Sequence, residues 1–265
     1  MSGFDAAWLG LREPADRAAR AWPLVEALSR HLAAHPAPRL LDIGCGTGST
    51  WRSLVGHLPA HTGWRLLDHD PLLLEQARQR IGSETGVEIA AFDLNAFEAL
   101  DCADFAVVSA SALFDLCSAS FCGRVVAHLA RHRVGLYAAL NYDGVMHWSV
   151  GHPLDEEVVA DFNRHQTGDK GFGPALGPAA TDHLRTAFER HGYAIAVAES
   201  PWLLGPEDRA LQEAFLDGVM QPLAEIGRLP SGDVLAWRRF RSRVLGQPGS
   251  LCRVGHLDLL ALPPQ

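Results

Sequence analysis

An acid followed by three evenly spaced glycines is the part of the chain best suited to chemistry. The pattern runs from Asp42 to Gly48 and has the form acid-x-Gly-x-Gly-x-Gly. Gly44 and Gly46 would let the backbone bend tightly and admit a ligand where a Cβ would clash. The helix that we expect from Ser49 would direct its first N–H groups at that ligand. The turn therefore predicts a ligand-binding site.

Three classes of ligand bind turns of this kind. A dinucleotide site has the pattern G-x-G-x-x-G, but in the register from Gly44 the third glycine position holds Ser49. A nucleoside-triphosphate loop needs a lysine after its last glycine, and no lysine lies near this turn. Asp42 would also repel a phosphate. S-adenosylmethionine has no phosphate and carries a sulfonium and an ammonium group, so it is the ligand that the residues favour.

The segment 40–48 (LLDIGCGTG) closely resembles the first motif of class I S-adenosylmethionine-dependent methyltransferases. Three further matches follow in the order of that family. Asp68 ends a predicted strand, where the family has an acid that accepts hydrogen bonds from the ribose hydroxyls. Asp93 and Leu94 resemble the adenine contact, and residues 104–109 (DFAVVS) resemble the fourth strand, beneath the methionine portion.

The resemblance covers residues 36–142 well and extends to 181–201 and 250–262 by pattern alone. It implies that S-adenosyl-L-methionine is the cofactor, that S-adenosyl-L-homocysteine is the product, and that the methyl group moves by in-line displacement at the sulfonium. The cofactor-binding residues that it implies are Asp42, Gly44, Cys45, Gly46, Gly48, Asp68, His69, Asp93, Leu94 and Ser109.

Strands and helices alternate along the chain, as in a parallel α/β sheet. We expect helices at 14–34, 49–58, 71–81, 118–132 and 182–191, and strands at 39–43, 64–67, 87–92, 105–109, 134–140, 193–199 and 251–262. Right-handed crossovers then give an α/β fold with a doubly wound, mostly parallel seven-stranded sheet, like that of class I methyltransferases. Ligands bind such sheets at the carboxyl ends of the strands.

We expect one domain over residues 1–265, with an N-terminal helix within 1–35. Two inserts exceed a minimal domain of this fold. The first, 143–180, is too glycine-rich around 168–174 for regular structure, and the second, 206–246, is expected to form two helices split at 230–233. Long connections in compact domains are usually lids or binding loops, so we expect both inserts to cap the acceptor site.

The acceptor pocket of this family follows the fourth and fifth strands, and several polar side chains occur there. The candidate catalytic bases are Asp115, His147 and His152, and the candidate acceptor contacts are Tyr142, Trp148, His165 and Lys170. A hydroxyl acceptor needs a base to remove its proton, whereas a neutral amine needs less help. Roles without function stay open as alternatives: Asp115 as a polar residue at a helix start, and Lys170 as part of a solvated loop.

The composition of the chain disfavours several classes of binding partner. Lys170 is the only lysine beside 22 arginines, and the net charge of −8 disfavours a nucleic-acid partner. The short cluster of arginines at 238–243 is too small to reverse that balance. Because no apolar run reaches about 18 residues, we expect no membrane partner. The five cysteines have no metal-binding spacing and no signal peptide is evident, so we expect no metal and a cytoplasmic protein.

The function that these features favour is methyl transfer to the oxygen or nitrogen of a small-molecule acceptor. Three alternatives remain: a peptide or protein methyltransferase, a non-catalytic regulator or partner subunit that binds S-adenosylmethionine, and a dinucleotide-dependent oxidoreductase. The sequence leaves the acceptor and the oligomeric state open.

Overall fold

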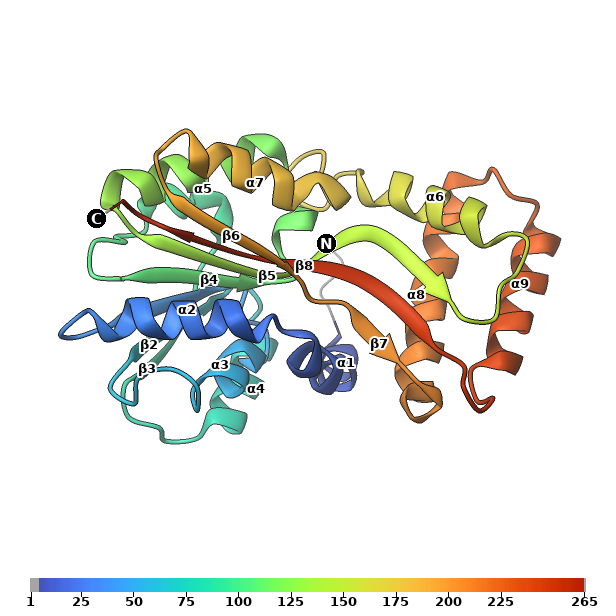
Figure 1. Ribbon diagram of the computed structural model, residues 1–265, viewed down its shortest axis with the longest axis horizontal. Helices are drawn as coiled ribbons and strands as arrows, with labels where there is room; N and C mark the ends of the chain where they lie inside the picture. Colours follow the sequence, from blue (N-terminus) through green and yellow to red (C-terminus); the bar gives the residue numbers. More distant parts are fainter. Residues whose placement is uncertain (1–4, 265) are drawn as a thin grey trace.

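The computed structural model describes residues 5–264, and its centre is a sheet covered by helices on both faces (Figure 1). Its strands are β1 (Arg39–Ile43), β2 (Gly63–Asp68), β3 (Val87–Ala91), β4 (Val107–Ser111), β5 (Gly135–Trp148), β6 (Ala194–Glu199), β7 (Trp202–Leu204) and β8 (Cys252–Leu262). The strand order is β3-β2-β1-β4-β5-β8-β6, with β7 paired to β8 beside this path. Neighbours from β3 to β5 are parallel, whereas β8 runs antiparallel to β5, β6 and β7. The doubly wound, mostly parallel sheet is confirmed, and β7 adds a strand that we did not predict.

The helices flank this sheet or extend beyond one end of it. They are α1 (Ala6–Ala19), α2 (Trp22–Ala33), α3 (Ser49–Leu54), α4 (Pro71–Ile81), α5 (Ala119–His132), α6 (Asp155–Gln166), α7 (Ala180–Glu189), α8 (Arg209–Ile226) and α9 (Ser231–Val244), with short 3-10 helices η1 (Leu94–Ala99), η2 (Phe114–Leu116), η3 (Gly177–Ala179) and η4 (Pro206–Asp208). Helices α5 and α7 pack on one face of the sheet, and α2, α3 and α4 pack on the other (Figure 1).

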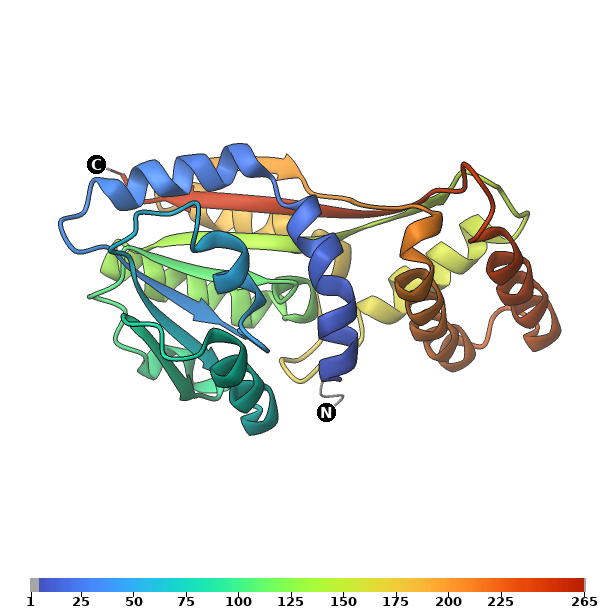
Figure 2. The ribbon, with the colours of Figure 1, turned by 90° about the horizontal axis from the view of Figure 1, so that it is seen from below.

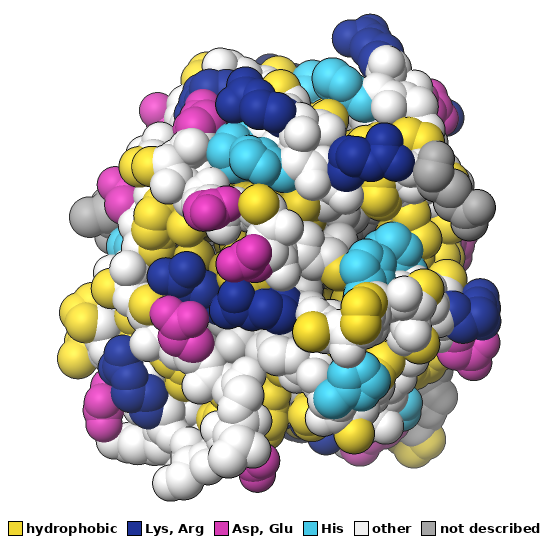
Figure 3. Space-filling model, turned by 90° about the vertical axis from the view of Figure 1, so that its left-hand side faces the viewer, with side chains coloured by type: hydrophobic (Ala, Val, Ile, Leu, Met, Phe, Trp, Pro, Cys, Tyr) yellow, Lys and Arg dark blue, Asp and Glu magenta, His cyan; other side chains and the backbone are white. Residues whose placement is uncertain are grey.

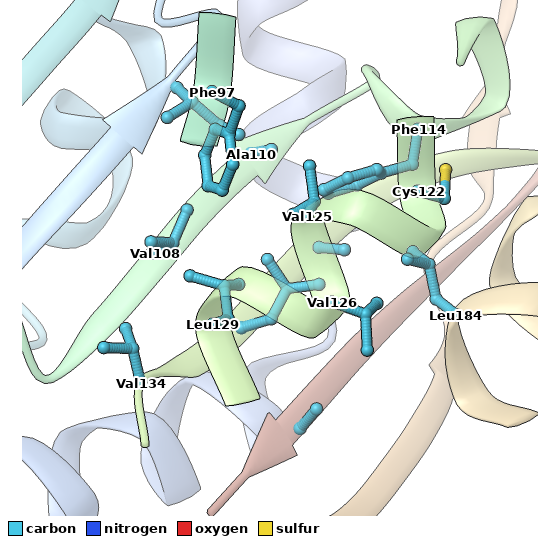
Figure 4. Packing of buried hydrophobic residues seen from close by; sticks show 14 of the residues in the cluster. Phe97, Val108, Ala110, Phe114, Cys122, Val125, Val126, Leu129, Val134 and Leu184 are labelled. Carbon is cyan, nitrogen blue, oxygen red and sulfur yellow. The ribbon is translucent and has the colours of Figure 1, made fainter. Parts of the chain in front are cut away.

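The core between α5 and the sheet follows from two periodicities. Alternate residues of β4, Val108 and Ala110, point toward α5, because successive side chains of a strand point to opposite faces. Val125 and Leu129, four residues apart on one face of the helix, pack against them (Figure 4). The carboxyl ends of the parallel strands are thereby held at one edge, where the candidate site lies.

The N-terminal segment departs from the prediction, because the expected helix at 14–34 is two helices. Residues 1–4 of the predicted N-terminal segment, 1–35, lie outside the described residues. The helices separate at Arg20 and Ala21, whose ψ angles are 138° and 85°. There the N–H of Ala21 donates to Asp258 on β8 at 3.1 Å, and Arg20 reaches Ser111 on β4 at 3.0 Å. These tertiary hydrogen bonds replace a continuous helix.

The first insert is more regular than predicted. Strand β5 continues to Trp148 because it pairs with β8 along most of its length, with irregularities between Ala138 and Asn141 and between Tyr142 and Met146. Helix α6 follows, and only the glycine-rich part around 168–174 is irregular. The two helices predicted in the second insert, 206–246, are confirmed as α8 and α9.

Beyond the sheet, the ends of β5, β7 and β8 carry a helical lobe made of α6, α8 and α9 (Figures 1 and 2). Its centre holds a fully buried cation, Arg241, which pairs with Asp155 and lies 4.4 Å from the ring of Trp148. Arg241 also donates to the carbonyl of Val150 at 2.7 Å, and Trp237 donates to Asp155 at 2.8 Å. This cluster fastens α9 to the start of α6.

The face of the molecule drawn in Figure 3 carries no large patch of a single charge. On the end of the molecule away from α8 and α9, basic and acidic side chains are interspersed (Figure 3). Two arginines of the cluster at 238–243 are paired or buried within the protein, because Arg238 pairs with Glu213 and Asp217 and Arg241 is buried.

Within residues 5–264, no helix is long and apolar enough to cross a bilayer, and no three side chains converge as metal ligands.

Replacing Arg241 with Met should lower the free energy of unfolding by about 3–5 kcal/mol, because Asp155 would lose its buried counterion. Urea denaturation measures this loss. The matched control is Arg239→Met on the same helix, where the side chain is exposed and the change should stay within about 0.5 kcal/mol. Equal values for the two variants would contradict the role given to this ion pair.

Candidate cofactor and acceptor site

The glycine turn after β1 needs its glycines for conformation and for space. The φ angles of Gly44, Gly46 and Gly48 are +62°, +53° and +81°, a region that side chains with a Cβ rarely adopt. A Cβ on Gly46 would lie 3.2 Å from Leu9 of α1, and one on Gly48 would lie 2.9 Å from Ile81 of α4. The turn is therefore closely covered by two helices.

Asp68, at the end of β2, fixes the shape of this turn. Its Oδ2 accepts a hydrogen bond from the N–H of Gly46 at 2.8 Å, and its Oδ1 accepts one from the N–H of Asp70 at 3.0 Å. Each carboxylate oxygen can accept more than one hydrogen bond, so Asp68 keeps the capacity to bind a ligand hydroxyl. The side chain is 8% exposed and lines the cavity described below.

Asp42 lies beneath the turn, fully buried on β1. Its Oδ1 accepts a hydrogen bond from the hydroxyl of Ser109 on β4 at 2.6 Å. Its Oδ2 is buried and has no hydrogen-bond partner among the described residues. Burial raises the pKa of Asp42 to about 7, although the hydrogen bond from Ser109 and the charge of Arg20 oppose the rise. A nearby cation would stabilise the ionised form of this carboxyl.

A cavity of about 410 Å³ opens where β1, β2 and β4 end. The predicted site residues that line it are Gly44, Cys45, Gly46, Asp68, His69, Asp93, Leu94 and Lys170. Asp42, Gly48 and Ser109 lie behind its wall, where Gly48 begins α3. The structure thus brings Gly44 and Lys170, which are 126 positions apart in the sequence, to one cavity.

Helix α1 closes one side of the cavity, which we did not predict. Leu9, Arg12 and Asp16 line the cavity from this helix. Arg12 donates to both oxygens of Asp16 at 2.8 and 3.2 Å, and Trp202 of β7 donates to Asp16 at 2.9 Å. The sequence indicates only that Arg12 and Asp16 are spaced for an ion pair on a helix. It does not show that this face of α1 packs against the glycine turn.

An ion pair attaches α1 to the glycine turn. Glu13 accepts two hydrogen bonds from Arg52 of α3, both at 2.7 Å, and Arg52 also donates to the carbonyl of Thr47 at 2.6 Å. Burial opposes ionisation of Glu13, but the hydrogen bond and charge of Arg52, with Arg80 and Arg17 nearby, keep the pKa of Glu13 below its ordinary value. The helix is thereby held over the site.

Lys170 borders the cavity from the glycine-rich loop, together with Gly171 and Phe172. The loop is ordered by Asp169, whose Oδ1 accepts hydrogen bonds from Gly171 and Gly173 at 2.7 and 3.1 Å. Phe172 packs on Phe121 of α5, with ring centroids 4.6 Å apart. The first insert therefore does reach the cavity, whereas no residue of the second insert lines it.

Three candidate residues do not line the cavity. Strand β5 carries His147, Trp148 and then His152 into the helical lobe. His147 is exposed, and Trp148 packs against Trp237 with ring centroids 5.7 Å apart. The ring of His152 lies 4.9 Å from that of Phe240, and its Nδ1 accepts a hydrogen bond from the N–H of Leu154. Packing in the lobe accounts for Trp148 and His152.

Asp115 and Tyr142 lie closer to the site but do not line the cavity. Asp115 sits in η2 between Leu113 and Leu116, which do line it. The Oδ1 of Asp115 is buried with no hydrogen-bond partner in the described chain, and burial raises the pKa of this carboxyl to about 6. The hydroxyl of Tyr142 donates to Asn163 of α6 at 2.8 Å.

Part of the chain matches a known protein family. Residues 40–133, about a third of the chain, match the model of a methyltransferase domain. A search of curated protein sequences finds no match.

Solved structures resemble the chain over most of its length at low identity. A mycolic acid cyclopropane synthase in complex with S-adenosylhomocysteine is 12% identical with a TM-score of 0.51, covering 91% of this chain and 83% of that one. A phosphoethanolamine N-methyltransferase from Haemonchus contortus is 14% identical (TM-score 0.49; 92% of this chain and 53% of that one). A methyltransferase from Geobacter sulfurreducens is 15% identical (TM-score 0.48; 98% and 99%). The chain spans about half the length of the Haemonchus enzyme.

The fold and the family match define the class. Residues 40–133, which include the glycine turn, match a methyltransferase domain, and the parallel sheet with its antiparallel β8 is the fold of class I methyltransferases. The recognition made from four short motifs is thereby confirmed.

The buried carboxyl of Asp42 predicts a pH dependence of stability. Its pKa is about 7 in the folded protein against an ordinary value near 3.8, so the folded state keeps this proton to higher pH. The stability that this provides is complete below about pH 4 and is lost as the pH rises through about 7. Asp42→Asn cannot titrate, so its free energy of unfolding should rise relative to wild type between about pH 4 and pH 7 and the difference should then level off. Urea denaturation at several pH values, without ligand, measures the difference.

Asp233→Asn serves as the control, because Asp233 is exposed on α9. Its difference from wild type should stay constant over the same pH range. A constant difference for Asp42→Asn as well would show that the buried carboxyl does not hold its proton as described.

Proposed function

We propose that this protein transfers the methyl group of S-adenosylmethionine to the oxygen or nitrogen of a small-molecule acceptor. The observation that carries the proposal is the cavity at the carboxyl ends of the strands, where the glycine turn meets Asp68 and Asp93. When bound there, S-adenosylmethionine supplies an electrophilic methyl group on a sulfonium and leaves as S-adenosylhomocysteine.

The residues present fit this cofactor. Asp42 lies behind the cavity wall, from where its ionised form would favour a ligand with positive charge without touching it, and Asp68 retains lone pairs for the ribose hydroxyls. Asp93 uses its Oδ1 to cap η1 through the N–H of Asn95 at 2.9 Å, which leaves Oδ2 for the exocyclic amine of adenine. Leu94 offers an apolar surface to the ring. Nothing in this set favours a phosphate near the turn.

The contribution of the protein to the reaction is alignment. Helix α1 and residues 170–172 both border the cavity, so an acceptor in it would be held and partly shielded from water. Correct positioning alone is worth roughly 7–11 kcal/mol in favourable cases. Of the three proposed bases, only Asp115 lies beside the cavity wall, and a pKa of about 6 suits proton acceptance near neutral pH. A neutral amine acceptor would need no such base.

The covered cavity supports a small acceptor over a peptide or protein. A polypeptide acceptor needs an open groove, whereas Leu9 of α1 approaches the glycine turn closely here. A cytoplasmic location is part of the same proposal, supported by the five cysteines, all of which are free thiols.

Cofactor binding is tested by thermal denaturation. S-adenosylhomocysteine should raise the melting temperature and NAD should not. Asp68→Ala should weaken S-adenosylhomocysteine binding about 10-fold or more, because hydrogen bonds to a charged group are lost. Asp101→Ala is the matched control: Asp101 is exposed and also accepts a local backbone hydrogen bond, from Ala103 at 3.0 Å. Stabilisation by NAD alone would refute the proposal.

Methyl transfer is tested with methyl-labelled S-adenosylmethionine and a metabolite extract. Label in the small-molecule fraction is the expected result. Label found only in added protein would favour the peptide or protein methyltransferase, and tight binding with no transfer to either would favour a regulator or partner subunit.

A further inference from the structure

Lys170 is a cation that borders the cavity without an acid in contact. Its Nζ lies 3.2 Å from Nδ1 of His165, and no carboxylate of the described residues lies within 4.0 Å of it. Burial lowers the pKa of Lys170, and Glu225 opposes this from a distance. A partly buried ammonium without a counterion is costly, and an anion bound in the cavity would offset that cost.

The other guanidinium or ammonium group that borders the cavity is already neutralised. Arg12 gives its Nε and Nη2 to Asp16, and the second hydrogen bond to that carboxylate comes from Trp202. Within the described part of the chain, Lys170 is therefore the cavity-lining cation that is free to pair with a ligand.

Lys170 is held in place by a chain of two side chains. An ammonium can only donate, so Nδ1 of His165 must accept from Lys170, which leaves the proton of the ring on Nε2. That Nε2 donates to Oε2 of Glu225 on α8 at 2.7 Å. Two N–H bonds of Lys170 remain for a ligand. The hydrogen bonds of Asp169 hold the same loop, so the lysine is oriented before any ligand binds.

The cavity is divided by charge. Asp68 and Asp93 lie at the ends of β2 and β3, on the side of the sheet away from β5. Lys170 lies on the opposite side, beyond β4, where Phe172 packs on α5 and Ser118 forms a bridge with Ala175. Asp68 and Asp93 occupy the part of the cavity that we assign to the ribose and adenine, and Lys170 borders the part that remains for the acceptor.

We propose that Lys170 binds a carboxylate or phosphate group of the methyl acceptor, so that the substrate is an organic anion. This inference rests on the proposed function, since it concerns the acceptor half of the same cavity. His165 and Glu225 are positioning residues, because they act on the anion only through the orientation of Lys170.

The test uses the full chain saturated with S-adenosylhomocysteine, with benzoate and inorganic phosphate as separate probes. At least one of the two should bind the wild-type complex, as measured by calorimetry, and Lys170→Met should weaken that binding about 10-fold. Lys170→Arg should keep most of it. Arg164→Met is the matched control, because Arg164 is an exposed cation on the last turn of α6, and its loss should leave anion binding unchanged.

The methionine carboxylate of the cofactor is another anion with the same chemistry. Comparing S-adenosylhomocysteine with 5′-methylthioadenosine, which lacks that carboxylate, separates the two sources. We expect Lys170→Met to bind both nucleosides as wild type does. Weaker binding of S-adenosylhomocysteine alone would assign Lys170 to the cofactor and overturn the proposal.

His165→Phe tests the positioning role, since phenylalanine keeps the ring but removes both nitrogens. Anion binding should fall several-fold while S-adenosylhomocysteine binding and the free energy of unfolding stay unchanged. If S-adenosylhomocysteine binds and neither anion does, the acceptor inference fails alone. If S-adenosylhomocysteine itself does not bind the wild-type protein, the proposed function fails first.

Discussion

The hydrogen bond from the N–H of Gly46 to Asp68 joins the ends of two adjacent parallel strands, and the site depends on it. It places a carboxylate of β2 against a turn of β1 whose backbone only glycine adopts easily. Side chains from β4, α1 and the loop after α6 are then arranged around that joint. A substitution at either residue would disturb the shape of the turn and the polar surface offered to a ligand together.

The part of the site that could be predicted is the part built by local patterns. A glycine turn after a buried strand and acids at the next two strand ends are visible in sequence, because each strand end and its polar residue are adjacent in the chain. The cavity contains Gly44, Asp68 and Asp93 as those patterns indicate.

The part that could not be predicted depends on how far elements extend. His147 and His152 follow a strand, and an end of β5 near Leu140 would have left them at the cavity. Pairing with β8 instead carries β5 to Trp148, and a strand advances about 3.3 Å per residue, so these histidines move well beyond the site. Arg12 was missed for the opposite reason: its partners Asp16 and Trp202 are 186 positions apart, and only the folded chain brings them together.

The attachment of α1 by Glu13 and Arg52 has a consequence for the energetics of the whole chain. This helix contacts the rest of the molecule through the ion pairs of Glu13 with Arg52 and Arg80, the hydrogen bond from Trp202 to Asp16, and the packing of Trp8 and Arg12 on Trp202. Because α1 lines the cavity together with the glycine turn and the ends of the strands, a ligand bound there would contact both α1 and the sheet. Occupancy and the ordering of the first helix are thus thermodynamically linked: each makes the other more favourable by the same free energy.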